Sequence, residues 1–535
     1  MSSAPPGSAP DSSPLAAFAY PAFTVLWLAT VLSNTGTWMH DVGAGWLMTS
    51  LAPSPLWVAL VQVATSLPIF LLALPAGALA DMVDRRRMLL SVQVVLALVA
   101  AGLGIVVASG HATPLVLLLF TFVMGMGAAL SAPAWQAIVP SLVPRHVLQQ
   151  AVASNSVGIN ISRATGPALA GVMITAFGVA APFLINAGSY LLIVAALLWW
   201  RQPVQAQRRL PTEDLIGAMR SGLRYAWHSR PLKATLIRAV GFFIFASAYW
   251  ATLPLIARDI LTGGVELYGL LLTCVGLGAV GGAFCLSWLR ARLGADGVVA
   301  AGTLGTALSM SCLALMRLPV VAGLACMLAG LSWIAVLTSL NVSAQVALPD
   351  WVRARGLSIF VTVFFGAQTI GSMVWGQTAG VLGIPAALLL AAAGAVLFIP
   401  LTWRHKLHQG GPLNLAPSMH WPAPVAADEQ RHDRGPVMIT IEYRIELHSA
   451  SEFTAVMDEM SRQRRRDGAY AWGLFEDVEQ PGRYLEYFLV SSWLEHLRQH
   501  ERVTHADQDM QERARVFHVG DEPPRVSHLI APERQ

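Results

Sequence analysis

Charged residues are scarce in this sequence. Asp, Glu, Lys and Arg make up 12% of its 535 residues, whereas hydrophobic residues make up 55% and the mean hydropathy is +0.55. Soluble globular proteins carry about 25% charged residues. The composition therefore excludes an ordinary soluble protein and is typical of a chain that crosses a membrane many times.

The few acidic residues are also unevenly distributed along the chain. Only ten of the 31 precede residue 405, while eighteen lie between Val437 and Gln535. The net charge of +4 is thus an average over two regions of different composition. We expect a membrane region to be followed by a soluble domain.

Several motifs and signals are missing as well. The four cysteines all lie in apolar runs and follow no metal-binding spacing, so neither a disulfide framework nor a metal site is expected from them. The sequence has no Gly-x-x-x-x-Gly-Lys-Ser/Thr motif, which argues against a pump driven by a nucleotide. Residues 1–20 contain no Lys or Arg, unlike a cleaved signal peptide, and are expected to form a disordered tail.

Long apolar runs predict twelve membrane-spanning helices, because about 20 residues suffice to cross the hydrocarbon core. The runs lie at residues 21–48, 55–80, 87–109, 112–138, 148–177, 179–200, 234–260, 266–289, 296–316, 319–346, 355–381 and 384–403. With a cytoplasmic N-terminus, the turns and loop on the inner side hold fifteen Lys and Arg residues, and the outer turns hold two. This imbalance predicts that both termini face the cytoplasm, in a bacterial inner membrane.

An internal repeat divides these helices into two halves. Three residues recur at a constant offset of 205: Gly77, Arg85 and Arg87 as Gly282, Arg290 and Arg292. We therefore expect an all-α polytopic membrane protein with two six-helix halves, residues 21–200 and 234–404, joined by a cytoplasmic loop over 201–233. Parallel halves of this kind hold their substrate site near the midplane between them.

The turn after the second run carries two carboxylates and three arginines between apolar segments. Its pattern, Gly77-x-x-x-Asp81-x-x-x-Arg85-x-Arg87, resembles the loop between the second and third helices of major facilitator superfamily transporters. The resemblance implies that these four residues belong to one gate of the transporter, which is held by charge pairing and helix-dipole contacts. A turn with positive charge inside and no gating role is the alternative.

Ionisable residues inside apolar spans are costly, so each is a candidate for function. Asp41 lies in the first span, on one helical face with Asn34 and Trp38. A carboxylate there could exchange protons or pair with a cationic substrate. The alternative is that Asp41 lies near enough to the outer surface to be in water.

Arg163, in the fifth span, must face a cavity or a partner because its guanidinium cannot lose its charge, and Asn160 lies one turn away. The segment with Gly166, Pro167 and Gly171 resembles the fifth-helix motif of major facilitator antiporters, which implies a pliable helix bend. A structural role for Arg163, tying helices together, is equally open.

The fourth-helix motif of the same exporters has an arginine before Gly-x-Gly-x-Ala, whereas this chain has Thr121 at that place. Because of this departure, Asp41 and Arg163 are the candidate residues to couple transport to proton movement. The stretch from Ala132 to Pro144 looks like the enterobactin and siderophore exporters. The resemblance covers roughly residues 20–404.

The remaining segments predict an inner-surface helix, a linker and a soluble domain. Residues 213–227 have apolar residues at helical spacing, with Thr212 as cap, and predict an amphipathic helix whose arginines face anionic membrane lipid. Residues 405–436 have the composition of a linker. Residues 437–530 then predict a strand, a helix capped by Ser451, two strands, a helix and a strand, which is a ferredoxin-like α+β domain.

This domain resembles the antibiotic-biosynthesis monooxygenase family of dimeric ferredoxin-like proteins, which implies a homodimer. His496 and His500 share a helical face, a spacing used for metals, but no third ligand is forced onto that face, so no metal is expected. Five aromatic residues are expected on the open face of the sheet, as a pocket or a dimer interface: Tyr470, Trp472, Phe475, Tyr487 and Phe488.

These features predict a secondary active transporter that exports a small amphipathic molecule, such as a siderophore or drug, in exchange for protons. We expect no enzyme activity, no cofactor and no nucleic acid; the partners are the substrate, protons and membrane lipid. Two alternatives stay open: a membrane-anchored monooxygenase-like enzyme that the helices feed with substrate, and a ligand sensor.

Overall fold

The computed structural model describes residues 15–201, 215–407, 414–415, 418, 434–520 and 522–532. Contacts between residues divide the chain into two compact units. The first unit comprises residues 1–215, 235–342 and 360–407, and the second comprises residues 216–234, 343–359 and 408–535. Each unit is described by itself below.

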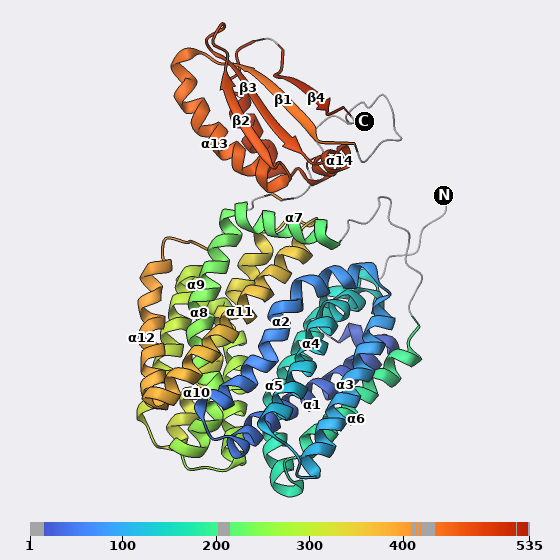
Figure 1. Cartoon of the computed structure of the whole chain (residues 1–535), viewed down its shortest axis with the longest axis vertical. Helices are drawn as coiled ribbons and strands as arrows, with labels where there is room; N and C mark the ends of the chain where they lie inside the picture. Colours follow the sequence, from blue (N-terminus) through green and yellow to red (C-terminus); the bar gives the residue numbers. More distant parts are fainter. Residues whose placement is uncertain are drawn as a thin grey trace, which may run out of the picture. The chain divides into compact units, whose positions relative to one another are not determined.

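The first unit is a bundle of long helices (Figure 1). Its first half contains η1 (Ala16–Ala19), α1 (Pro21–Leu51), α2 (Pro55–Met82), α3 (Arg85–Ala108), α4 (Pro114–Leu142), η2 (Arg145–Val147), α5 (Leu148–Phe177) and α6 (Ala181–Trp199). Its second half contains most of α8 (Arg230–Leu255), η3 (Ile256–Ile260), α9 (Val265–Leu315), α10 (Pro319–Val346), α11 (Arg353–Leu382) and α12 (Ile384–Thr402). The apolar runs are thus confirmed as helices, within a few residues at each end. Residues 16–19, expected in the tail, form a 3₁₀ helix whose Ala17 is buried.

Within the described residues, nine helices are long and apolar enough to cross a membrane. One of them, α9, has 51 residues and is interrupted at Gly294, whose φ of 66° and ψ of 179° are not helical. Two further helices, α1 and α5, have 31 and 30 residues but carry more polar side chains. The chain is therefore a mostly helical, multi-pass membrane protein.

Helix ends follow from local chemistry that the two halves share. Asp84 caps α3, because its carboxylate accepts a hydrogen bond from the backbone N–H of Arg87 at 2.9 Å. Gly178 directly follows α5 with φ of 83°, and Gly383 directly follows α11 with φ of 86°. Only glycine adopts such angles without strain. These two glycines also differ by the offset of 205 that the repeat predicts.

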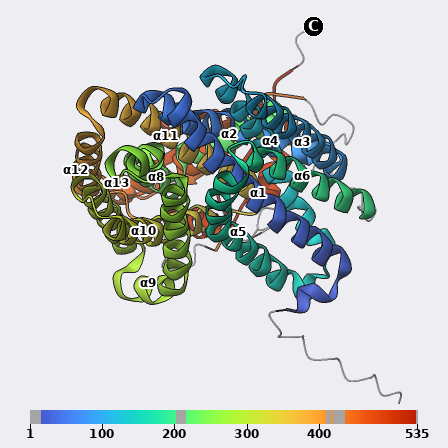
Figure 2. The same ribbon diagram turned by 90° about the horizontal axis from the view of Figure 1, so that it is seen from below.

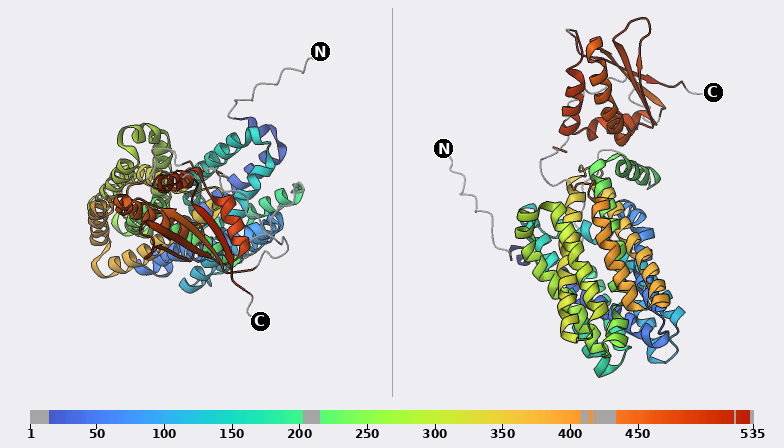
Figure 3. Two further views of the ribbon diagram at one scale, coloured as in Figure 1. Left: turned by 90° about the horizontal axis from the view of Figure 1, so that it is seen from above. Right: turned by 90° about the vertical axis from the view of Figure 1, so that its left-hand side faces the viewer.

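The second unit contains a four-stranded antiparallel sheet with the strand order β2-β3-β1-β4. Its strands are β1 (Val437–Arg444), β2 (Ala471–Glu476), β3 (Arg483–Val490) and β4 (Arg525–Ile530). Three helices pack on one face of the sheet, as Figure 3 shows: α13 (Ala450–Asp467), α14 (Trp493–Arg502) and α15 (His505–Arg515). Between sheet and helices lies an apolar core that includes Ile439, Phe453 and Phe488.

Three expectations for this sheet region need correction. The helix expected over residues 493–517 is two helices, because Thr504 begins α15 with a capping box to Asp507. Ser451 is not a cap, since α13 begins one residue earlier and the residue at its cap position is Ser449. Trp472 and Phe488 face the helices, not the open side: they pair across β2 and β3, and Phe488 is fully buried.

The open face of the sheet keeps the other aromatic residues. Phe475 is 60% exposed and its ring stacks on Tyr487, with 5.7 Å between the ring centroids. Tyr470 and Leu485 are exposed as well. Side chains alternate between the two faces of a strand, so Trp472 and Phe475, three residues apart, could never have shared one face.

The second unit also contains α7 (Leu215–His228), which lies where the amphipathic helix is predicted. Thr212, its expected cap, lies outside the described residues. Arg224 forms an ion pair with Glu495 of α14 at 3.2 Å, and the hydroxyl of Tyr225 donates to the carbonyl of Ala347 at 2.9 Å. The expectation that the arginines face lipid is therefore wrong for Arg224.

Candidate functional site

The two halves of the helical bundle meet at α5 and α9, where glycines allow the backbones to touch. A Cβ atom on Gly269 would lie 2.6 Å from the carbonyl oxygen of Pro167, and one on Gly276 would lie 3.0 Å from that of Arg163. Gly171 faces the first residues of α9 in the same way. Small residues permit such close approach between membrane helices. The predicted bend residues Pro167 and Gly171 thus lie on the boundary between the halves.

A second contact between the halves joins α2 to α11, which lie side by side in Figure 2. The hydroxyls of Ser66 and Thr369 are 2.8 Å apart in a buried hydrogen bond. Nearer the turn between α1 and α2, Gly376 packs on α2, and the guanidinium of Arg258 donates to the carbonyl of Thr49. The contacts of Gly376 and Thr49 lie at the end of the bundle that holds the α1–α2 turn, whereas the Ser66–Thr369 bond lies near the middle of α2.

Asp41 is half-buried on α1, beside tyrosines from both halves. It interacts electrostatically with the phenols of Tyr190 from α6 and Tyr268 from α9. The Tyr190 hydroxyl lies 3.1 Å from Thr37 Oγ1, and the Tyr268 ring stacks on Trp46. Among the described residues, Asp41 has no ion pair or hydrogen bond. Its carboxylate is therefore available to a proton or a ligand.

Arg163 lies on α5 beside the same helix. Its guanidinium carbon is 5.8 Å from the centre of the Trp38 ring, a cation–π arrangement, and it interacts electrostatically with Tyr249 of α8. Gly166 makes this possible, because any Cβ there would lie 2.5 Å from Cβ of Trp38. In the described part of the chain Arg163 has no ion pair or hydrogen bond.

The second half contributes an aromatic cluster next to Arg163. Tyr249 and Trp250 of α8 pack against Trp333 of α10, with 5.5 Å between the centroids of Trp250 and Trp333. Phe243 and Phe364 extend the cluster to α11, with centroids 4.3 Å apart. Flat aromatic faces next to one guanidinium suit a ligand that is partly apolar and partly anionic.

The predicted polar residues around Asp41 and Arg163 are only partly brought together. Asn34, like Trp38, is half-buried on α1. Asn160 is not directed at Arg163, because its side-chain NH₂ donates to the carbonyl of Ser156 in its own helix at 2.9 Å. The amide expected beside the guanidinium is thus bonded within α5.

The charged turn after α2 forms the short connection between α2 and α3. Gly77 lies in α2 and Arg85 begins α3, while the side chain of Asp81 lies outside the described residues. Arg87 is exposed and lies 3.9 Å from the carboxylate of Asp84. Arg86, which the motif does not include, donates to the carbonyls of Leu197 and Leu198 at the end of α6.

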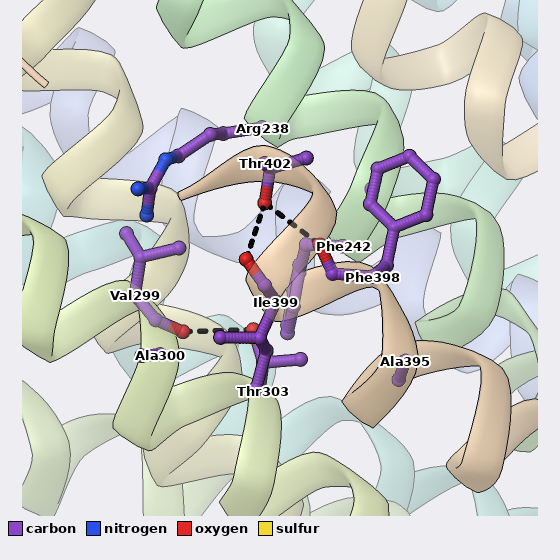
Figure 4. A pocket seen from close by; sticks show the side chains of 10 residues that line it. Arg238, Phe242, Val299, Ala300, Thr303, Ala395, Phe398, Ile399 and Thr402 are labelled. Carbon is purple, nitrogen blue, oxygen red and sulfur yellow. Dashed lines mark hydrogen bonds between the residues drawn. The ribbon is translucent and has the colours of Figure 1, made fainter. Parts of the chain in front are cut away.

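Sequence reasoning missed a buried cation in α8. Arg238 is 3% exposed and forms an ion pair with Asp296 at 3.0 Å, while its Nε donates to the carbonyl of His405 at 2.8 Å. Its place inside a predicted span was the available signal. Figure 4 shows Arg238 beside a hollow between α8, α9 and α12; the hydroxyls of Thr303 and Thr402 there bond within their own helices. We regard this hollow as an apolar crevice rather than a substrate site.

These arrangements can be compared with known proteins. A sequence model of one family, described as transmembrane secretion effector, matches residues 12–535 of the chain. The chain belongs to this family. Its members are major facilitator transporters, so the paired halves and the charged turn have the context that the sequence motifs imply.

Several relatives of this chain are named as transporters. The staphyloferrin A transporter of Staphylococcus aureus is 29% identical over 251 residues, which are 46% of this chain and 62% of that protein, less than two thirds of its length. The enterobactin exporter EntS of Salmonella typhimurium is 25% identical over 71% of this chain and 90% of its own length. The multidrug efflux pump Tap of Mycobacterium bovis is 25% identical over 70% and 90%.

Solved structures share the fold of the helical part of this chain. A peptide transporter of the POT family, solved in complex with a thioalcohol-conjugated peptide, has a TM-score of 0.61 at 14% identity, covering 72% of this chain and 96% of that one. The nucleoside transporter NupG has a TM-score of 0.54 at 12% identity, covering 72% and 100%. The function that family and relatives support is efflux by a major facilitator transporter.

Proposed function

We propose that the protein is a proton-coupled exporter of a small amphipathic molecule, such as a siderophore or a drug, in the bacterial inner membrane. One observation carries the proposal. A carboxylate, Asp41, and a guanidinium, Arg163, are both without ionic partners among the described residues, and both lie where aromatic side chains of the second half meet the first. Uncompensated charge inside a membrane is costly, which favours a role with a ligand or proton.

The proposed architecture has twelve spans. Nine helices qualify by length and composition; α9 counts twice because of its break at Gly294, and α1 and α5 add two. These two helices are less apolar because they carry the proposed site residues. The excess of basic residues on one side supports a cytoplasmic location for both termini.

Alternating access would start from the state in which the two halves are arranged in this structure. The contacts through Gly269 and Thr49 lie toward the proposed outer surface, which corresponds to a state closed on the outside, and the Ser66–Thr369 bond lies near the middle of α2. Opening there requires the halves to rock apart, as in other transporters built from repeats. Gly77, Asp81, Arg85 and Arg87 would hold the opposite, inner gate, and the cap at Asp84 would fix the start of α3.

The proposed substrate class is inferred from the side chains that line the boundary between the two halves. Arg163 would pair with an anionic group, and Trp38, Trp250 and Trp333 would contact flat or apolar parts of the same molecule. Asp41 would exchange protons. Arg163 would then bind the substrate, while Asp41 couples its transport to the proton flow. The names of the relatives, which include transporters of staphyloferrin A and enterobactin, fit such a molecule.

The sheet region, residues 437–530, would be a ferredoxin-like accessory domain after the linker over 405–436. The strand order β2-β3-β1-β4 with the helices on one face supports this fold. Its buried carboxylate, Glu486, pairs with Arg464 and accepts hydrogen bonds from Tyr443 and Trp472. A carboxylate that is satisfied in this way favours a structural role over catalysis. The apolar open face supports a homodimer.

Substrate binding by Arg163 tests the proposal directly. Purified protein in detergent should bind an anionic aromatic siderophore, measured by calorimetry. Arg163→Gln should weaken binding by about tenfold or more, since a charge-assisted hydrogen bond contributes about 1.5–3 kcal/mol. Arg163→Lys should recover part of the loss, and Arg317→Gln, at an exposed position in the turn between α9 and α10, should have little effect. Equal affinity of Arg163→Gln and wild type would exclude Arg163 from the binding site.

A further inference from the structure

Three histidines come together on the helix-covered side of the sheet, away from the transport path. His496 and His500 lie one turn apart on α14, and His528 lies on β4, opposite Ile439 of β1. The nearest ring nitrogens of all three lie within 4.8 Å of one another. His528 could not be predicted as the third member from the spacing of His496 and His500, because β4 brings it to the helix from a later part of the chain.

The hydrogen bonds around His496 fix which ring nitrogen carries the proton. Gln499 Nε2 donates to the backbone carbonyl of Asp467 at 3.3 Å, so the other amide atom, Oε1, faces His496 Nδ1 at 3.3 Å. A carbonyl oxygen only accepts, and Nδ1 must therefore hold the proton. The lone pair of His496 is then on Nε2. Histidines that bind metals commonly donate their other N–H to a carbonyl in this way.

The lone pair of His496 points toward a second nitrogen at the spacing that a metal requires. His496 Nε2 and His500 Nε2 are 3.2 Å apart. Two nitrogens bound to one tetrahedral Zn²⁺, each at about 2.0–2.1 Å, lie about 3.3–3.4 Å apart. To bind one ion, His500 would carry its proton on Nδ1 and both rings would turn their Nε2 lone pairs toward the ion, while the separation of the two nitrogens changes by only about 0.2 Å. His528 is exposed on its strand, so its side chain has room to swing in as the third ligand.

The charges around the cluster leave room for a cation. Arg464, which interacts electrostatically with His496, is compensated by its ion pair with Glu486 at 3.0 Å.

We propose that His496, His500 and His528 form a binding site for a transition-metal ion of the Zn²⁺ type. Three imidazole ligands without a carboxylate suit Zn²⁺, Cu²⁺, Ni²⁺ or Co²⁺ and disfavour Mg²⁺ and Ca²⁺. With three protein ligands, the fourth tetrahedral position is open to water or a small ligand. The site does not depend on the identity of the exported substrate.

The helix that carries this site, α14, contacts two other segments of the second unit. Glu495, next to His496, forms the ion pair with Arg224 of α7. Arg502, at the end of the same helix, packs its guanidinium 4.5 Å from the ring centre of Trp351, in the segment between α10 and α11. A metal that holds α14 to β4 would therefore stiffen the helix that makes both contacts.

Metal titration of the full-length protein tests the proposal. The protein is purified in detergent with an affinity tag that contains no histidine and is stripped with a chelator. Zn²⁺ binding is measured by calorimetry, and Co²⁺ binding by its visible absorption. We expect one equivalent of each ion and the intense bands of tetrahedral Co²⁺. His500→Ala and His528→Ala should each lower the affinity at least about 100-fold, and Gln499→Ala about 10- to 100-fold.

Matched controls separate this site from other histidines and from misfolding. His505→Ala, which removes an imidazole that is hydrogen-bonded to Gln508, should bind as wild type does. Because His528 is exposed and lies on an edge strand, His528→Ala should keep the wild-type circular dichroism. If the wild type binds no ion, the histidine pair is only a hydrogen bond and the proposal is wrong. Stoichiometric binding that survives His528→Ala and His500→Ala would place the ion elsewhere and overturn it equally.

Discussion

At the scale of single residues, ionisable groups in the spans were predictable from the sequence, but their partners were not. Asp41 and Arg163 are conspicuous because apolar runs surround them. Arg238 is equally conspicuous, yet its partner Asp296 lies at the start of a distant helical segment. Spacing along one helix can show which residues share a face. It cannot show which residue of another helix will face them.

The Arg238–Asp296 pair gives a stability prediction. Asp296→Leu removes the ionic partner of the buried guanidinium and leaves its hydrogen bond to the carbonyl of His405, so we expect a loss of about 3–5 kcal/mol, as when one member of a buried pair is removed. Adding Arg238→Met should recover much of this loss, because the double variant buries no charge. Thermal unfolding in detergent measures both. A double variant less stable than Asp296→Leu would contradict the account.

At the scale of elements, the helices follow directly from the apolar runs, while their packing depends on glycines whose role the sequence does not reveal. Gly269 and Gly276 permit contact with α5, but they look no different from Gly281, which has open space around it. The strands are similar: their positions along the chain were predicted, but the face of the sheet on which Trp472 and Phe488 lie was not. Facing surfaces are set by tertiary contacts.

The contact between α5 and α9 gives an element-scale prediction. Gly269→Ala would place a methyl group 2.6 Å from the carbonyl of Pro167 and push the helices apart. Overpacking costs about 1–3 kcal/mol, which is about 5- to 150-fold in the population of the outward-closed state. Export should fall accordingly at normal abundance in the membrane.

Gly281→Ala is the matched control for this prediction. It lies in the same helix, and an added methyl group meets no atom within 4 Å. Its export rate should equal that of the wild type. Equal rates for Gly269→Ala and Gly281→Ala would show that the close contact is unimportant for transport.

At the scale of the whole molecule, the proposed homodimer depends on the open face of the sheet. Phe475, Leu485 and Leu529 expose apolar surface there, and burying it contributes about 25 cal/mol per Å². The full-length protein should run as a dimer in sedimentation in detergent, and Phe475→Glu should yield monomers. Val516→Glu, which changes an exposed apolar residue outside the sheet, should stay dimeric. A wild-type monomer at high concentration would contradict the proposed interface.

The sheet domain also bears on whether the protein is mainly a transporter or an anchored enzyme. A chain that ends at Leu407 keeps the carbonyl of His405 for Arg238 and the N–H of Leu407 for Asp296. Transport should persist in this shortened protein, because the proposed path lies within the first unit. Complete loss of transport at normal abundance would favour the enzyme or sensor alternative.

The measurement that tests the central claim most directly is uptake into everted membrane vesicles, across a panel of siderophores and drugs. With an imposed proton gradient, vesicles that contain the wild-type protein should accumulate at least one amphipathic compound, and an uncoupler should abolish the accumulation. Asp41→Asn should bind that compound without accumulating it, whereas Asp259→Asn, at the outer turn, should behave as wild type. Accumulation that ignores the gradient, or that Asp41→Asn leaves intact, would contradict proton-coupled export through Asp41.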